Sequence, residues 1–255
     1  MSIKLYQGDC IDLMNNIDGR SIDCIICDLP YGVTQNQWDS VIDLDKLWAC
    51  YKRILKPNGA VLLFGQDKFT MRVMLSNESW HRYNLIWNKE VPTGFLNANR
   101  MPLRVHEDIM VFYENLPTFN PQKYIGNSPS HARCKKNSVP TEEASNNHNY
   151  GSYKNGDFNN DILNSNSKFP TSIISCERVP TGKCVHPTQK PIALLEWLIR
   201  TYSNEGDTVL DNCMGSGTTG VACKNTHRNF IGIELNEEYF KIAEKRIRMA
   251  NPFNI

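Results

Sequence analysis

Short apolar runs that alternate with amphipathic stretches are the feature that most constrains the fold of this chain. Five runs have the length and composition of buried strands: 3–6, 22–27, 60–64, 83–87 and 109–113. Between them, residues 44–55 and 67–75 repeat apolar side chains at helical spacing. This alternation predicts an α/β domain with a mostly parallel sheet and helices on both of its faces.

The same pattern returns near the end of the chain. Pro191 stands at the start of an apolar stripe that runs to Tyr202, which is typical of a helix with proline in its first turn. Residues 208–210 and 230–233 are predicted strands, and 218–224 is a predicted helix between them. A last amphipathic helix follows, so the alternating architecture continues here.

A polar stretch at 126–170 separates these two parts. It contains ten asparagines, five lysines or arginines and few aliphatic residues, so it cannot build a core of its own. Two interpretations stay open: a surface insertion, or a segment that becomes ordered on a polar partner.

Composition limits the class of protein. Of the 255 residues, 40% are hydrophobic and 22% are charged. No apolar run is long enough to span a membrane, and the start of the chain lacks a signal-peptide pattern. The nine scattered cysteines favour the reducing cytoplasm. Because the net charge is only +1, any surface that binds nucleic acid must be local.

The cysteines do not indicate a metal site. Cys24 and Cys27 lie in a predicted strand, and their odd separation puts the two side chains on opposite faces. A second set of candidate ligands comprises His131, Cys134, His148, Cys176, Cys184 and His186. The spacing of this set matches no ligand template, so we expect no metal.

Asp28-Leu29-Pro30-Tyr31 directly follows the predicted strand 22–27. An acidic side chain, a stiff proline and an aromatic ring at a strand end are poorly suited to packing. They suit the binding of a planar nitrogenous ring, with the carboxylate accepting from an amino group and the tyrosine stacking on the ring. This arrangement predicts a binding site but does not by itself name a reaction.

A glycine-containing loop at 211–219 joins a predicted strand to a predicted helix. Its glycines allow close approach of a ligand to the backbone, and Glu234 ends the next strand, where a carboxylate can bind ribose hydroxyls. These features indicate a nucleoside cofactor. Gly215, Gly217 and Gly220 also fit the dinucleotide spacing, so the loop alone leaves NAD and S-adenosylmethionine open.

Three motifs together resemble the S-adenosylmethionine-dependent amino-methyltransferases of DNA: Asp-Leu-Pro-Tyr at 28–31, His-Pro-Thr-Gln-Lys-Pro at 186–191 and Asp-x-x-x-Gly-Ser-Gly-Thr-Thr at 211–219. Their order is similar to that of the circularly permuted beta group. The resemblance implies a Rossmann-like methyltransferase fold divided into a catalytic half at 1–115, a target-recognition insertion at 116–180 and a cofactor-binding half at 181–255.

The resemblance also implies roles for the tetrad. Asp28 and the carbonyl of the second residue would accept the two N–H bonds of an exocyclic amino group. The family usually has proline at that second position, but Leu29 supplies the same carbonyl. Pro30 would fix the turn, and Tyr31 would stack on a base that has left the duplex.

Cofactor contacts are implied for Asp9, Cys10, Asp28, Thr188, Lys190, Asp211, Cys213, Gly215, Ser216, Gly217, Thr218, Thr219 and Glu234. Asp9 would lie near the adenine, Glu234 at the ribose, Asp211 near the methionine amino group, and Thr188 or Lys190 near its carboxylate. Candidate DNA contacts are Trp38, Lys89, Arg100 and Arg104.

The aspartate at the first tetrad position resembles enzymes that methylate N6 of adenine. The expected function is therefore transfer of a methyl group from S-adenosylmethionine to adenine in duplex DNA. The alternatives are cytosine-N4, RNA or protein-glutamine methylation, and a catalytically decayed nucleic-acid-binding protein. The resemblance also allows for a homodimer and a restriction endonuclease partner, in the cytoplasm of a bacterial or archaeal cell or encoded by a phage.

Overall fold

The structure is a computed structural model, and it describes residues 1–32, 42–127, 145–147, 151–153, 166–180, 182, 184–186 and 189–250. Trp38, Thr188, His131, Cys134 and His148, all considered above, lie outside the described residues. The chain divides into two compact units: a main unit of Met1–Asn120 with Ser172–Ile255, and a second unit of Pro121–Thr171.

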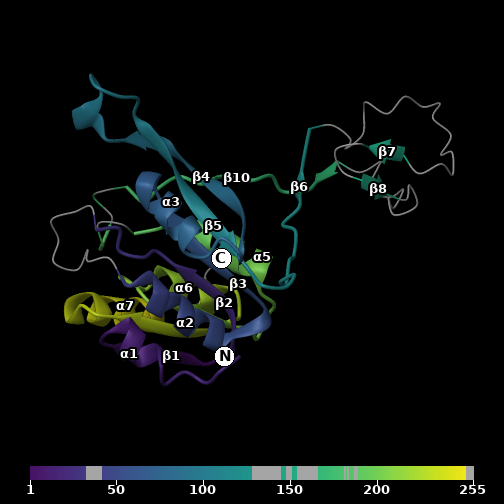
Figure 1. Cartoon of the computed structure of the whole chain (residues 1–255). Coiled ribbons are helices and arrows are strands. Elements are labelled where there is room, and N and C mark those ends of the chain that lie inside the picture. Colours follow the sequence, from purple (N-terminus) through teal and green to yellow (C-terminus); the bar gives the residue numbers. More distant parts are fainter. Residues whose placement is uncertain are drawn as a thin grey trace. The chain divides into compact units, whose positions relative to one another are not determined.

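An eight-stranded sheet forms the centre of the main unit (Figure 1). In spatial order its strands are β1 (Ile3–Gln7), β12 (Asn229–Glu234), β11 (Thr208–Asp211), β2 (Ile22–Cys27), β3 (Leu55–Gly65), β5 (Arg104–Phe112), β4 (His81–Thr93) and β10 (Ile173–Ser175). Neighbouring strands pair in parallel except for β5, which is antiparallel to both β3 and β4. The predicted mostly parallel sheet is confirmed.

Helices cover the two faces of this sheet. One face packs against α1 (Cys10–Met14), α2 (Leu44–Ile54) and α3 (Asp67–Ser76). The other face packs against α5 (Ile192–Tyr202), α6 (Thr218–Asn225) and α7 (Glu237–Met249). From Cys24 to Cys27, successive residues of β2 alternate between the two cores, so Cys24 and Cys27 lie on opposite faces as predicted.

Two local features differ from the predictions. The strand predicted at 60–64 begins earlier in the structure, because β3 starts at Leu55 and includes the Lys-Pro-Asn-Gly stretch at 56–59, where its pairing with β2 shifts. This shift is a local irregularity of the kind that accommodates extra residues in one strand. The short strand β10 was not predicted, since its three residues carry too little periodicity to be recognised.

The second unit contains two small antiparallel pairs among its described residues. β6 (Tyr124–Ile125) pairs with β9 (Ser167–Lys168), and β7 (Ser145–Asn147) pairs with β8 (Gly151–Tyr153). Tyr124 and Ile125 are both exposed. In the main unit, a single turn of 3-10 helix, η1 (Phe95–Asn97), lies between β4 and β5. Within the described ranges, no helix has both the length and the apolar character required to cross a bilayer.

Gly217 fixes how α6 packs against α7. It precedes α6 with a φ of 76°, a conformation that glycine adopts without the steric cost of a Cβ. A Cβ added there would lie 2.8 Å from Cβ of Ala243 and 3.0 Å from Cδ1 of Ile247. The absence of a side chain therefore permits both the turn and the close approach of the two helices.

We predict that Gly217→Ala lowers the free energy of unfolding by about 2 kcal/mol or more, through left-handed strain plus overpacking. Gly206→Ala is the matched control, because Gly206 also has a positive φ of 85° but nothing within 4 Å of its added Cβ. The control should lose only about 1 kcal/mol. Urea unfolding followed by circular dichroism measures both; equal losses would contradict the packing argument.

Candidate active site

Four acidic side chains meet where the parallel strands end. Asp9 follows β1, Asp28 follows β2, Asp211 ends β11 and Glu234 ends β12. The amide of Gly8 donates to the carbonyl of Glu234 at 3.0 Å, which holds the ends of β1 and β12 together. In open α/β sheets, ligands bind at this carboxyl edge. Here the edge opens into a cavity of about 720 Å³, within the range of pockets that bind small molecules.

Most of the predicted site residues line this one cavity. They are Asp9, Cys10, Asp28, Leu29, Pro30, Tyr31, Lys190, Asp211, Cys213, Gly215, Ser216, Thr218, Thr219 and Glu234. Gly217 is not among the lining residues, because its missing side chain faces α7. Thr188 lies outside the described residues.

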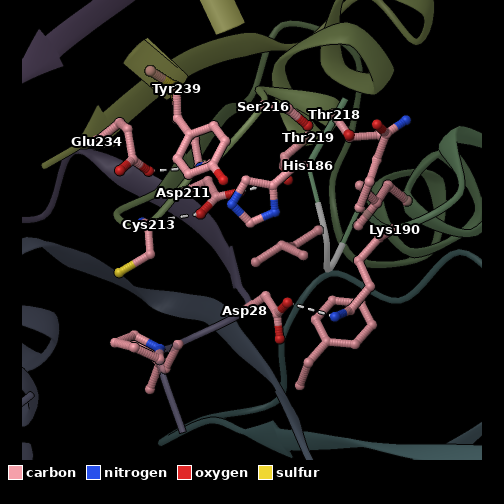
Figure 2. Close-up of a pocket in the computed structure, with 18 of the residues that line it drawn as sticks. Asp28, His186, Lys190, Asp211, Cys213, Ser216, Thr218, Thr219, Glu234 and Tyr239 are labelled. Carbon is pink, nitrogen blue, oxygen red and sulfur yellow. Dashed lines mark hydrogen bonds and ion pairs between the residues drawn. The ribbon is translucent and has the colours of Figure 1, made fainter. Parts of the chain in front are cut away.

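Asp28 lies in a polar environment at the end of β2. The hydroxyl of Tyr31 donates to Oδ1 of Asp28 at 2.8 Å. Nζ of Lys190 donates to Oδ2 at 2.5 Å (Figure 2). Burial raises the pKa of Asp28, and the Lys190 ammonium and the Tyr31 hydroxyl offset this only in part. Both carboxylate oxygens are therefore engaged.

The other tetrad residues have distinct environments. Leu29 is 3% exposed and packs in the core beneath α1, α2 and α3, at the point where it also lines the cavity. The Tyr31 ring stacks on Phe69, with centroids 4.5 Å apart and planes inclined by 28°. Phe69 thus fixes the plane of the ring that lines the cavity.

Lys190 is also part of a longer chain of charges. Its ammonium lies 3.4 Å from Oε2 of Glu107, and Nζ of Lys89 lies 2.5 Å from Oε1 of the same residue. Lys89 is 6% exposed, so its predicted role as a phosphate contact is wrong: its charge is buried and paired with Glu107. Lys190 lines the cavity as predicted, but its ammonium is directed to Asp28 and Glu107.

The glycine loop and the β12 end hold two further carboxylates. Oδ2 of Asp211 accepts from the Thr219 hydroxyl at 2.6 Å, and Oδ1 accepts from the amide of Cys213 at 3.2 Å. Burial raises the pKa of Asp211 to about 7. Glu234 accepts from the amides of Gly215 and Asn236, each at 2.8 Å. Its pKa is also raised by burial, against the effect of these amides.

The amide and thiol groups beside the loop are arranged by local structure. Asp9 caps α1, since its Oδ1 accepts from the amides of Ile11 and Asp12 at 2.8 and 3.2 Å. Cys10 and Cys213 line the cavity, and the pKa of each thiol lies above its ordinary value. Both side chains are therefore neutral.

Among the described residues, no group of histidine, cysteine or acidic side chains has the arrangement to hold a metal ion.

Sequence reasoning missed several residues that line the cavity: Phe64, Gln66, Trp87, Glu107 and Tyr239. His186, recognised in the sequence as the start of the 186–191 motif, also lines it. His186 packs edge-on against Tyr239, with centroids 4.2 Å apart. Burial, followed by Lys190 and Arg246, lowers the pKa of His186 to about 4, so its ring is neutral at physiological pH. No sequence pattern singled out Glu107, because it lies between His106 and Asp108 in the polar first half of β5.

The predicted DNA contacts differ in their availability. Arg104 donates to Asp67 at 2.5 Å and to Gln66 at 3.0 Å, so its guanidinium is already bound within the protein. Arg100 follows η1 in an exposed segment of the connection between β4 and β5. Arg100 stays a prediction, and Trp38 lies outside the described residues.

Comparison with known proteins agrees with this geometry. A family model described as DNA methylase, of the N6/N4 type, matches residues 22–245. The chain belongs to this family. It is 30% identical to the Type II methyltransferase M.HinfI of Haemophilus influenzae over 97% of this chain and 69% of that protein. It is also 30% identical to the Type II methyltransferase M.HpaI of Haemophilus parainfluenzae, over 97% of this chain and 74% of that protein.

Solved structures give the same result. The complex of M1.HpyAVI with SAM matches with a TM-score of 0.63 and 27% identity, over 97% of this chain and 100% of that chain. The cytosine-N4-specific PvuII DNA methyltransferase matches with a TM-score of 0.67 over 100% of this chain and 88% of that chain. Its identity of 16% shows the fold alone. The predicted family and the Rossmann-like α/β fold of this methyltransferase are thus confirmed.

Proposed function

We propose that this DNA methylase transfers the methyl group of S-adenosylmethionine to N6 of adenine in duplex DNA. The observation that supports this most directly is the cavity, which brings Asp28 and Tyr31 to the same carboxyl edge of the sheet as Asp211 and Glu234. One part can bind an amino-bearing ring and the other a nucleoside cofactor. M1.HpyAVI, which is 27% identical to this chain, has been solved in complex with SAM.

The side chains of the cavity fit S-adenosylmethionine. Glu234 is 8% exposed at the end of β12, where its carboxylate can accept from ribose hydroxyls. Asp211 can pair with the methionine amino group, and we expect Asp9, which lines the same cavity, to lie near the adenine. Gly215 has a φ of 50° and carries no side chain into the cavity, so a ligand can approach its backbone closely. When bound, the cofactor supplies an electrophilic methyl group on a positively charged sulfur.

The tetrad prepares the amino group of the base. The nitrogen lone pair of an exocyclic amine is delocalised into the ring, so the amine is a weak nucleophile. If Asp28 and the carbonyl of Leu29 each accept one N–H bond, the lone pair is directed away from them. The negative charge of Asp28 also stabilises the positive charge that develops on the nitrogen. The raised pKa of this buried carboxyl suits it to receive the released proton, directly or through water.

The first tetrad residue is aspartate, which favours adenine N6 over cytosine N4. The second unit, Pro121–Thr171, lies within the stretch 116–180 that we propose as the target-recognition insertion. A homodimer, a restriction endonuclease partner and a cytoplasmic location stay predictions.

The direct test is to locate the transferred methyl group. Purified protein is incubated with methyl-labelled S-adenosylmethionine and duplex DNA of mixed sequence, and the digested nucleosides are separated. We predict label on N6-methyldeoxyadenosine, and a loss of about 10³-fold or more in rate for Asp28→Ala because orientation and charge stabilisation are both removed. Cofactor binding to Asp28→Ala should persist as its control. Label on cytosine, or only on RNA or protein added in parallel, would contradict the assignment of adenine in DNA.

A second prediction concerns protons released when the cofactor binds. Below pH 7 the α-amino group of the cofactor is already charged, whereas Asp211, with a pKa of about 7, is mostly protonated. Pairing with an ammonium favours the ionised form, so binding should release a fraction of a proton. Calorimetry in buffers of different ionisation enthalpy measures this release. Asp211→Asn should abolish it; an unchanged release in that variant would contradict the assigned contact.

A further inference from the structure

Four charges of alternating sign, all at least largely buried, connect β4 and β5 with the tetrad: Lys89, Glu107, Lys190 and Asp28. Their side chains are 8%, 14%, 9% and 20% exposed, respectively. The contacts are 2.5 Å from Lys89 to Glu107, 3.4 Å from Glu107 to Lys190 and 2.5 Å from Lys190 to Asp28. Buried charges are expensive unless each has a partner. Because the signs alternate, each of the four side chains has at least one neighbour of opposite charge.

Lys190 occupies a carboxylate oxygen of Asp28 that the amino group of a target base would need as an acceptor. Oδ1 of Asp28 accepts from Tyr31, and Oδ2 accepts from Lys190. The amino group of a target base must therefore replace or share one of these donors. The ammonium lies 4.9 Å from the centre of the Phe64 ring, a distance at which a cation–π contact stabilises it in this position.

Glu107 offers Lys190 an alternative partner. Oε2 of Glu107 is buried and accepts no hydrogen bond from any described residue. The Lys190 ammonium is already 3.4 Å from it. A small movement away from Asp28 would convert this ion pair into a hydrogen bond. Displacing Lys190 from Asp28 would then leave neither the lysine nor Glu107 without a partner.

We propose that Lys190 is a positioning residue: it pairs with Asp28 in the free protein, keeps that carboxylate oriented and ionised, and transfers to Glu107 when the target amino group arrives. Glu107, fixed in turn by Lys89, is the second positioning residue of the same device. The proposal rests on the methyl-transfer function proposed above. It departs from the expectation that Lys190 binds the methionine carboxylate.

Electrostatics explains why Asp28 needs this counterion. The titratable groups that influence it are Tyr31, Cys27, Glu107, Lys190 and Asp211. Among these, Lys190 is the cation, while Glu107 and Asp211 are carboxyl groups. Without Lys190, Asp28 would face like charges in a buried site, and its protonated form would be favoured. A protonated carboxyl donates a hydrogen bond from one oxygen, so it could no longer hold an amino group correctly.

The test measures the pH dependence of kcat/KM for DNA, which reports the ionisation of groups in the free enzyme. On the acidic side of this profile, kcat/KM falls as Asp28 becomes protonated. In Lys190→Gln the midpoint of this acidic limb should move to a higher pH, by about 1–3 units. Lys190→Arg keeps the positive charge and should restore most of the shift. An acidic limb that stays in place while activity drops equally at every pH would overturn the proposal.

A double variant separates this account from a merely structural role. Adding Glu107→Gln to Lys190→Gln removes the negative charge that faces Asp28, so the acidic limb should move back toward that of the unmodified protein. A limb that stays shifted would contradict the role of Glu107. Cofactor affinity, measured by calorimetry, should be nearly unchanged in Lys190→Gln. A large loss of affinity would assign Lys190 to the methionine carboxylate instead.

An NMR titration of Asp28 tests the positioning role of Lys190 independently of the proposed methyl transfer. Carbon-13 labelling of the aspartate carboxyl groups allows Asp28 to be titrated by NMR, with Asp28→Asn as the assignment control. The Asp28 midpoint should rise in Lys190→Gln, whether or not the protein methylates DNA. If the unmodified protein transfers no methyl group to DNA, the proposed function fails. If the midpoint is the same with and without Lys190, the positioning role fails.

Discussion

The parallel pairing of β1, β12, β11 and β2 is the constraint on which the site depends. Because these strands run in one direction, the residues that end them meet at one edge. Four carboxyl groups that are far apart in sequence are thereby brought to a single cavity. Such a cluster would be unfavourable without compensation, because charges lose hydration on burial and repel one another.

Each carboxyl group is stabilised by its own local donors. Asp9 accepts from the amides that begin α1, Glu234 from two backbone amides, and Asp211 from Thr219 and the amide of Cys213. Asp28 alone takes a lysine. This difference matches the proposed roles: three groups would hold a cofactor in a fixed arrangement, whereas the fourth must exchange its partner during the reaction.

Sequence reasoning was strongest where function is carried by contiguous motifs. The tetrad at 28–31 and the loop at 211–219 could be recognised because a strand end and a helix start dictate where their side chains and amides lie. The alternation of β2 residues likewise placed Cys24 and Cys27 on opposite faces correctly. These inferences need only local periodicity and the geometry of a strand end.

Sequence reasoning was weakest where two residues that lie far apart in the sequence form an ion pair. Lys89 and Arg104 looked like surface cations, but each has an acidic partner that local pattern cannot identify. The contact between Lys190 and Asp28 joins positions 162 residues apart, and Glu107 lies on an antiparallel strand that interrupts the parallel order. Gly217 was assigned to the cofactor, although its missing side chain serves the packing of α6 against α7.

The most direct test of the account is the structure of the protein bound to duplex DNA and a non-reactive cofactor analogue. The account predicts a flipped adenine whose N6 lies within hydrogen-bond distance, about 2.7–3.2 Å, of both Asp28 and the carbonyl of Leu29. It also predicts the Lys190 ammonium in contact with Glu107. A bound base whose amino group lies away from Asp28, with Lys190 still paired to that carboxylate, would contradict it.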